Sequence, residues 1–247
     1  MTVLVLGGTA EARALAEALV AAGTPVLSSL AGRVSRPRLP VGGVHIGGFG
    51  GVGGLVDFLR GNGITRVVDA THPFAARISA NAAEACARTG VPLLRLVRPG
   101  WADEAGAARW TWVDDHDEAA RHAAALGRRV LLTTGRQTLH RFVAPLARHT
   151  VLARVVEAVD LALPPTWTLL RDRGPYTLDG ERTLMREHSV EVLVTKDSGG
   201  SYTRAKLDAA DELGVAVVVV RRPRYGGNAP EVTDVPAVLE WLGPTRR

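Results

Sequence analysis

Residues 3–11 read Val3-Leu4-Val5-Leu6-Gly7-Gly8-Thr9-Ala10-Glu11, an apolar run that passes through two glycines directly into an Ala/Leu-rich stretch. Short β-branched runs then alternate with helix-length amphipathic stretches almost to the end of the 247 residues. A strand followed by a crossover helix and another strand pairs in parallel, so this alternation predicts an α/β fold with mainly parallel sheets.

The expected strands are short and cover residues 3–6, 26–30, 44–46, 66–70, 93–96, 109–113, 129–133, 150–155, 192–195 and 215–220. The expected helices include residues 10–22, 52–61, 74–89, 115–126, 202–213 and 235–242. Gly23, Gly90 and Gly214 each end an expected helix and lead into a strand, as a glycine in the left-handed conformation does. The proline-interrupted segment 163–176 gives no readable pattern.

Residues 97–106 lack periodicity and precede a new series of strands and helices, which is typical of a domain boundary. We therefore expect two Rossmann-like, doubly wound domains, residues 1–98 and 99–247. In such folds ligands bind beyond the carboxyl ends of the strands. The sequence thus predicts an interdomain cleft where the carboxyl ends of both sheets converge.

Composition excludes several classes of protein. Cys86 is the one cysteine, so an intramolecular disulfide and a thiolate metal cluster are excluded, and a reducing cytoplasm is the expected location. The N-terminus lacks a signal-peptide pattern, and no apolar run reaches the roughly 20 residues of a membrane helix. A net charge of +5 spread along the chain and 5% aromatic residues argue against nucleic acid as a partner. The seven histidines show no i, i+4 ligand pair, so no metal is expected.

The glycine turn after the first strand is where a dinucleotide pyrophosphate approaches the backbone at a helix N-terminus. Gly7, Gly8, Thr9 and Glu11 are therefore candidate cofactor-binding residues. The letters depart from the G-x-G-x-x-G pattern because Ala12 stands where a glycine is expected. An ordinary tight turn capped by Thr9 is the alternative.

The second strand indicates which cofactor is bound. An NAD site usually has an acidic residue about 20 residues after the glycines, but residues 27–33 contain none. Ser28, Ser29 and Arg33 suit a 2′-phosphate instead, because hydroxyls donate to it and a guanidinium grips it with two bonds. NADPH is thus favoured over NADH, although Arg33 could be a solvated loop cation.

Residues 69–75 read Asp69-Ala70-Thr71-His72-Pro73-Phe74-Ala75 and lead into an expected helix from Phe74. Pro73 suits a first helical turn and Thr71 suits its cap. His72 at a sheet edge could bind a carboxylate or donate a proton. It could also simply cap the turn.

Two strand ends of the second domain carry similar polar loops. Residues 195–201 read Thr195-Lys196-Asp197-Ser198-Gly199-Gly200-Ser201, and residues 133–137 read Thr133-Thr134-Gly135-Arg136-Gln137. A lysine, hydroxyls and glycine amides at the start of a helix accept anions. Ordinary turns with incidental polar residues are the alternative for each loop taken singly.

Four stretches occur in the order found in a known family: residues 6–11, 69–75, 195–199 and the pair Arg222-Pro223. In these the chain resembles the precorrin-6A reductases of cobalamin biosynthesis over nearly its whole length. The resemblance implies NADPH-dependent reduction of one ring double bond in a metal-free tetrapyrrole, with NADPH in the first domain and the second contributing to the tetrapyrrole site. Neighbouring enzymes of the pathway are further expected partners.

The residue patterns and the resemblance together divide the candidate residues between two ligands. Those expected at the cofactor are Gly7, Gly8, Thr9, Glu11, Ser28, Ser29, Arg33 and Thr71. Those expected at the substrate are His72, Gly135, Arg136, Lys196, Asp197, Ser198, Gly199 and Arg222. Among them His72 and Lys196 are the candidate catalytic proton donors, with bulk water or a substrate carboxyl as alternatives.

Three other functions stay open at this point. One is the reaction of the anaerobic branch, which acts on the cobalt-containing analogue. Another is a non-catalytic binder of acidic ligands. The third is short-chain dehydrogenase chemistry, since Tyr202 and Lys206 have the Tyr-x-x-x-Lys spacing. That chemistry is expected to come with a first glycine turn of different spacing and with a serine about a dozen residues before the tyrosine, where this chain has Val190 and, at an expected helix end, Ser189.

Overall fold

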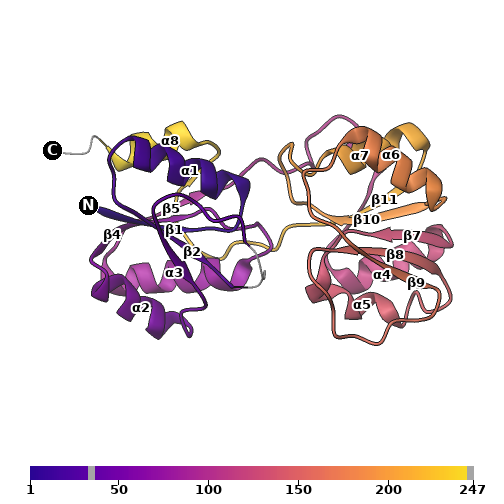
Figure 1. The fold of residues 1–247 in the computed structure, drawn as a ribbon, viewed down its shortest axis with the longest axis horizontal. Coiled ribbons are helices and arrows are strands. Elements are labelled where there is room, and N and C mark those ends of the chain that lie inside the picture. Colours follow the sequence, from indigo (N-terminus) through magenta and orange to yellow (C-terminus); the bar gives the residue numbers. More distant parts are fainter. Residues whose placement is uncertain (33–36, 244–247) are drawn as a thin grey trace. The chain divides into compact units, whose positions relative to one another are not determined.

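The computed structural model describes residues 1–32 and 37–243 of the chain. The chain forms two compact units, one of Met1–Pro99 with Pro223–Arg247 and the other of Gly100–Arg222. We call them unit 1 and unit 2. Each is built on a parallel sheet with helices on both faces, and the chain passes between the units twice (Figure 1).

The described residues of unit 1 form a six-stranded sheet in the order β3-β2-β1-β4-β5-β12. The strands are β1 (Thr2–Leu6), β2 (Val26–Leu30), β3 (Gly43–Ile46), β4 (Ile64–Asp69), β5 (Leu93–Leu96) and β12 (Glu231–Val232). The chain runs outward from β1 in one direction and from β4 in the other. The gap between β1 and β4 is therefore the topological switch point, where doubly wound folds bind ligands at the carboxyl ends of the strands.

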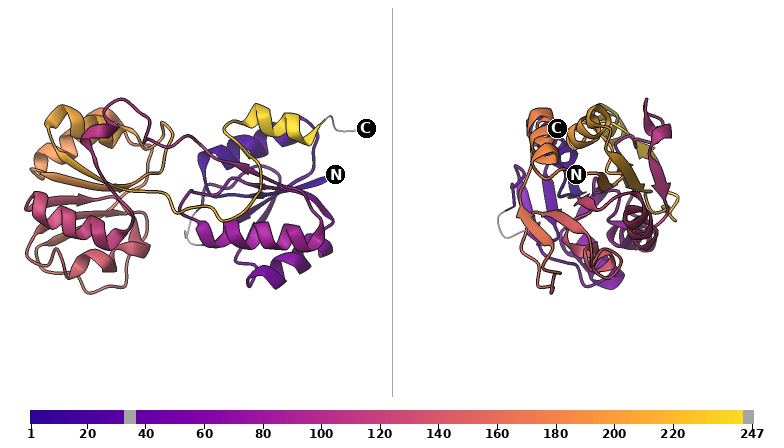
Figure 2. Two further views of the ribbon diagram at one scale, coloured as in Figure 1. Left: turned by 180° about the vertical axis from the view of Figure 1, so that it is seen from behind. Right: turned by 90° about the vertical axis from the view of Figure 1, so that its right-hand side faces the viewer.

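Helices cover both faces of the unit 1 sheet. On one face lie α1 (Ala10–Ala21) and α8 (Val235–Leu242), and on the other lie α2 (Val52–Gly61) and α3 (Ala76–Thr89), as Figures 1 and 2 show. Successive β1 residues serve opposite faces: Val3 and Val5 pack with the α1 and α8 residues, while Leu4 and Leu6 pack with those of α2 and α3. A strand buried on both faces reads as a continuous apolar run, which explains the opening sequence.

The described residues of unit 2 form a second six-stranded sheet in the order β9-β8-β7-β10-β11-β6. Its strands are β6 (Thr111–Val113), β7 (Arg129–Leu132), β8 (Thr150–Val155), β9 (Trp167–Arg171), β10 (Val192–Lys196) and β11 (Ala216–Val220). Its helices are α4 (His116–Leu126), α5 (His140–Val143), α6 (Leu178–Glu187) and α7 (Ala205–Leu213), with short 3₁₀ turns at Ala107–Arg109 and Arg136–Thr138. The switch point here lies between β7 and β10.

The C-terminal segment returns to unit 1, whereas the sequence analysis placed all of residues 99–247 in the second domain. Glu231 and Val232 of β12 pair with Arg95 and Leu96 of β5. Val238 and Leu242 of α8 pack in the same cluster as the β1 valines. The C-terminal strand thus covers the edge of the unit 1 sheet, and its helix completes one face of that unit.

Other boundaries shift by a few residues. The expected helix from Phe74 begins at Ala76, and the helix expected from Tyr202 begins at Ala205. The unreadable segment 163–176 contains β9 at the edge of its sheet. The glycine helix ends are confirmed: Gly90 and Gly214 adopt left-handed conformations with φ of 71° and 66°.

Within residues 1–32 and 37–243, none of the helices is both long enough and apolar enough to cross a membrane.

Candidate functional site

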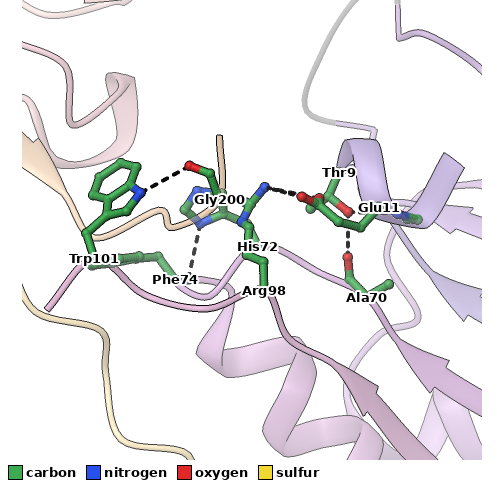
Figure 3. A network of polar contacts seen from close by, with 9 residues as sticks. Thr9, Glu11, Ala70, His72, Phe74, Arg98, Trp101 and Gly200 are labelled. Carbon is green, nitrogen blue, oxygen red and sulfur yellow. Dashed lines mark hydrogen bonds and ion pairs between the residues drawn. The ribbon is translucent and has the colours of Figure 1, made fainter. Parts of the chain in front are cut away.

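The turn after β1 is held open at the switch point of unit 1. Gly7 N–H donates to Ser29 O (2.9 Å). Gly8 has φ of 107° and an added Cβ there would meet nothing within 4 Å. Thr9 caps α1 by accepting from Ala12 N–H (3.1 Å) and donates its hydroxyl to Ala70 O (2.8 Å; Figure 3). The turn therefore presents exposed backbone beside the positive end of a 12-residue helix.

The carboxylate of Glu11, in the first turn of α1, is held by Arg98. Arg98 Nη1 donates to both carboxylate oxygens, at 3.1 and 3.0 Å (Figure 3). Arg98 was not among the predicted site residues, because it lies in the stretch that marked a domain boundary. Any contact of Glu11 with a cofactor stays a prediction.

Asp69 organises the turn after β4. Its carboxylate is 2% exposed and accepts from Thr71 N–H (3.1 Å) and from the Thr71 hydroxyl (2.6 Å). Thr71 therefore fixes its own turn and is not the cap of α3. Arg95 Nε lies 3.5 Å from the other Asp69 oxygen, and the Arg95 guanidinium stacks 3.7 Å from the Tyr225 ring.

His72 takes part in the same turn. Its Nδ1 accepts a hydrogen bond from Phe74 N–H (3.2 Å; Figure 3). An accepting Nδ1 carries no proton, so the neutral ring holds its proton on Nε2. His72 thus contributes to the turn in the structure, and any contact of His72 with a ligand stays a prediction.

A pocket gathers these residues at the carboxyl edge of unit 1. Its lining includes Thr9, Glu11, Asp69, Thr71, Arg95 and Arg98. The pocket therefore brings together three of the predicted cofactor residues, Thr9, Glu11 and Thr71. The charged residues Asp69, Arg95 and Arg98 also line it, and none of these three was a predicted site residue.

The predicted 2′-phosphate residues are placed differently. Ser28 and Ser29 lie within β2 and are only 2% and 6% exposed. The Ser28 hydroxyl is buried without a hydrogen-bond partner among the described residues. Arg33 lies outside the described residues.

The turn after β7 occupies the corresponding position in unit 2. Thr133 donates both its N–H (2.9 Å) and its hydroxyl (3.1 Å) to Val194 O, across the switch point. Thr134 is 2% exposed, and its hydroxyl has no hydrogen-bond partner in the described part of the chain. Gly135 has φ of 83°, and Arg136 is exposed and donates to Ala158 O (3.5 Å). Gly135 and Arg136 thus lie where they were predicted, at a carboxyl strand end.

Lys196 ends β10 on the other side of this switch point. Burial lowers the pKa of its ammonium to about 8. His116 is partly buried, and this burial together with the positive charge of Lys196 lowers the pKa of its imidazole to about 4. A buried lysine is strongly attracted to an anion that enters its surroundings. His116 was missed because nothing in its local sequence marks it as a site residue.

The remaining predicted residues lie in the loop after Lys196 or contact it. Ser198 and Gly199 are buried in it, and Gly199 has φ of 65°. Asp197 and Arg222, both predicted to bind substrate, bind each other: Arg222 Nε donates to Asp197 O (3.1 Å) and lies 3.3 Å from Asp197 Oδ2.

The Tyr202 and Lys206 pair does not form a dehydrogenase arrangement. Tyr202 precedes α7 and is 37% exposed, while Lys206 is 5% exposed and donates to Thr203 O (2.6 Å). The two side chains therefore do not share one helical face. Among residues 1–32 and 37–243, no group of three or more His, Cys, Asp or Glu side chains could hold a metal ion.

Comparisons with known proteins agree over nearly the full length. A sequence model of the family described as "Precorrin-6x reductase CbiJ/CobK" matches residues 2–243. The chain is 49% identical to "Precorrin-6A reductase" of Rhodococcus erythropolis, covering 99% of this chain and 98% of that protein. It is 35% identical to "Cobalt-precorrin-6A reductase" of Priestia megaterium, covering 91% and 92%.

A solved structure described as "CobK precorrin-6A reductase" is similar to this chain with a TM-score of 0.91 and 41% sequence identity. The similarity covers 100% of this chain and 99% of that one. The two chains therefore share strand order and domain content throughout.

Proposed function

The chain belongs to the precorrin-6x reductase CbiJ/CobK family, and we propose on that premise that it reduces precorrin-6A to precorrin-6B in cobalamin biosynthesis, with NADPH as the reductant. The activity is that of an oxidoreductase acting on one carbon–carbon double bond of the macrocycle. The observation that carries the proposal is the full-length match in sequence and in fold to precorrin-6A reductases.

Unit 1 fits a nicotinamide dinucleotide. The Gly8 backbone is open where a pyrophosphate would approach, and the N-terminus of α1 supplies N–H groups and positive dipole. Thr9 cross-links this turn to the turn after β4, which keeps the two sides of the crevice in register. When bound, the nicotinamide supplies the hydride, and the chain contributes its position and the exclusion of water.

The preference for NADPH rests on the second strand. No acidic residue follows β2 through position 37 to hold a ribose 2′-hydroxyl, and Arg33 lies in this stretch. A guanidinium can bind a 2′-phosphate through two parallel bonds. Arg33 is therefore the proposed 2′-phosphate ligand.

Unit 2 supplies the groups that suit an acidic substrate. The tetrapyrrole carries acetate and propionate side chains, which call for cations and polar hydrogens. Lys196 offers a buried ammonium and Arg136 an exposed guanidinium, and Thr134 offers a buried hydroxyl that has no hydrogen-bond partner among the residues that the structure describes. We assign these three, with the amides around Ser198 and Gly199, to substrate carboxylates.

Reduction needs a proton as well as a hydride. With a pKa of about 8, Lys196 is mostly protonated at neutral pH and loses its proton more readily than an ordinary lysine. His72 has its proton on Nε2 and is held by Phe74, which suits a neutral donor that orients a carboxylate. We therefore assign proton delivery to Lys196 and orientation to His72.

The metal-free substrate is favoured over the cobalt-containing one. The relative named for precorrin-6A is 49% identical, against 35% for the relative named for the cobalt compound. Both reactions reduce the same type of bond. Parallel assays with the two tetrapyrroles distinguish them.

The test is turnover with defined partners. The purified chain is incubated with precorrin-6A and either NADPH or NADH, and nicotinamide oxidation is followed by absorbance. We expect tetrapyrrole-dependent oxidation of NADPH and much slower oxidation of NADH. Binding of the tetrapyrrole without oxidation of either cofactor would indicate a binder of acidic ligands instead, and equal rates would contradict the NADPH preference.

A further inference from the structure

Two stretches of chain connect the units, and where they meet unit 2 both contact one residue, Asp197. The first connection enters unit 2 at Gly100, and Trp101 N–H donates to Asp197 Oδ1 (3.1 Å). The second leaves unit 2 at Arg222, whose Nε donates to Asp197 O (3.1 Å) and lies 3.3 Å from Asp197 Oδ2. One residue therefore binds the first and the last segments of the unit.

Asp197 is tightly packed. Asp197 is 5% exposed, and a Cβ added to Gly100 would lie 2.8 Å from its Oδ2. Trp101 is fully buried, and its Nε1–H donates to Gly200 O (3.1 Å; Figure 3). Trp101 thus binds the loop after β10 at two points. Gly100 is needed beside it, because a larger residue would clash with the Asp197 carboxylate.

The same loop carries proposed substrate contacts. Lys196 and Ser198 are the chain neighbours of Asp197, and Asp197 N–H donates to Val220 O (2.9 Å) on β11. β11 itself runs to within two residues of Arg222. Asp197 lies between Lys196 and Ser198 in the chain. A ligand that displaces either neighbour therefore also displaces the Asp197 atoms that bind the two connections.

We propose that Asp197 is a positioning residue that ties both connections to the loop after β10, and so limits the movement of unit 1 about those connections. Hinge positions of this kind lie at the ends of elements and affect kcat and KM together. The link to substrate binding rests on the proposed function of Lys196 and Ser198. The restraint on the connections rests only on the contacts of Asp197.

The first test measures distances in the ligand-free chain. Spin labels are attached at Ala87→Cys in unit 1 and Glu187→Cys in unit 2, both exposed positions, in a Cys86→Ser background. We expect Asp197→Ala to broaden the distribution of label distances. Gly100→Ala should broaden it too, because the added methyl displaces the same carboxylate by a different route.

Glu181→Gln is the matched control. Glu181 is a carboxylate of unit 2 that is 2% exposed, and its ion-pair partner is Arg154 (2.7 Å) of β8, which belongs to neither connection. Its loss should lower the melting temperature without broadening the distances. Equal broadening in Glu181→Gln would overturn the proposal, because a general loosening of unit 2 would then explain the effect.

The second test separates the proposal from the enzyme function. In Asp197→Ala we expect kcat/KM for precorrin-6A to fall by about 10-fold or more, since a misplacement of about 1 Å can cost about 100-fold. The Kd for NADPH, measured by fluorescence titration, should stay unchanged. Asp197→Asn keeps the acceptor for Trp101 N–H and should recover part of the loss.

The outcomes are distinguishable. Unchanged distances in folded Asp197→Ala and Gly100→Ala would overturn the inference whatever the kinetics. Broadened distances in a chain whose unsubstituted form does not turn over precorrin-6A would support the inference and contradict the proposed function. If Asp197→Ala does not fold, the distances in Gly100→Ala decide.

Discussion

Five strands of unit 1 and five of unit 2 follow the same order, with the edge strands β12 and β6 as the difference, but the two units offer different chemistry at the same point. In both, a threonine after the first central strand donates across the switch point, Thr9 to Ala70 O and Thr133 to Val194 O. In unit 1 this turn leads into a 12-residue helix, whereas in unit 2 it leads into a 3₁₀ turn and a four-residue helix. Topology thus places a crevice in each unit, and the helix and side chains determine the ligand.

The charged side chains at the two crevices differ as well. In unit 1, Glu11 binds Arg98 and Asp69 lies beside Arg95, so the cations there are already matched by carboxylates. In unit 2, burial raises the cost of the charge on Lys196. Unit 1 therefore suits a ligand held by backbone and helix dipole, and unit 2 suits a ligand that brings negative charge.

The largest expected effects come from adding a methyl group to the glycine of each turn, in separate variants. Gly8→Ala should abolish NADPH binding, because it strains a backbone with φ of 107° by about 1–3 kcal/mol and fills the approach to the pyrophosphate. Gly135→Ala, with φ of 83°, should leave NADPH affinity intact and raise the KM for precorrin-6A. Titration of NADPH into each variant measures the first effect.

Gly90→Ala controls for strain alone. Gly90 has φ of 71° and open space around it, but it ends α3 away from the carboxyl edge. Its melting temperature should fall while NADPH affinity is retained. Loss of NADPH binding in Gly135→Ala would reverse the assignment of the two crevices.

Arg33→Ala tests the preference for NADPH over NADH that we assign to unit 1. Removal of a charge-assisted contact should weaken NADPH binding by about 1.5–3 kcal/mol and leave NADH binding nearly unchanged. Parallel titrations with both cofactors provide the measurement. Equal losses for the two would exclude a 2′-phosphate role for Arg33.

Lys196→Ala should act on the other ligand. We expect the KM for precorrin-6A to rise by about 10-fold or more, because a substrate carboxylate loses its buried partner, while the KM for NADPH changes little. Steady-state kinetics with each substrate varied in turn separates the two. If only NADPH affinity falls, the loop belongs to the cofactor site.

Lys196 should also set the alkaline limit of activity. Burial lowers its pKa to about 8, so the proton that it delivers is present below this pH and lost above it. The kcat/KM for precorrin-6A, which reports the free enzyme, should therefore fall as the pH rises through about 8. In Lys196→Arg the guanidinium keeps its charge but does not release its proton in this range, so activity should be low at every pH and that alkaline fall should disappear. A fall at the same pH in both forms would assign it to another group.

His72→Asn should have the smallest effect. Asparagine can still accept the hydrogen bond from Phe74 N–H and can still donate to a carboxylate, so we expect a KM change of a few fold with kcat retained. Kinetics across pH, with a melting curve, provide the measurement. A kcat loss of about 100-fold would instead make His72 the proton donor.

The sequence predicted most of the fold because the apolar periodicity is local. Strands such as β1 and β8 and helices such as α2 and α8 lie where expected. The partner of a strand is not a local property, which is why the return of residues 223–247 to unit 1 was missed. β12 has two residues and gives no periodic signal at all.

Short motifs located the turns at the unit 1 pocket, but contacts between residues distant in sequence could not be predicted. Thr9 and Thr71 line the unit 1 pocket as their turns predicted. Arg98 is 87 residues from Glu11, and Trp101 is 96 residues from Asp197, so neither contact leaves a trace in a short window. Asp197 was accordingly taken for a ligand residue, although its carboxylate binds the protein's own chain.

The most direct measurement of the division of roles is hydrogen–deuterium exchange of the unsubstituted chain with and without NADPH, in the absence of any tetrapyrrole. We predict that NADPH slows exchange at the amides of residues 7–12 and 70–72, and leaves residues 133–138 unchanged. Protection centred on residues 133–138, with residues 7–12 unaffected, would contradict the assignment of the cofactor to unit 1.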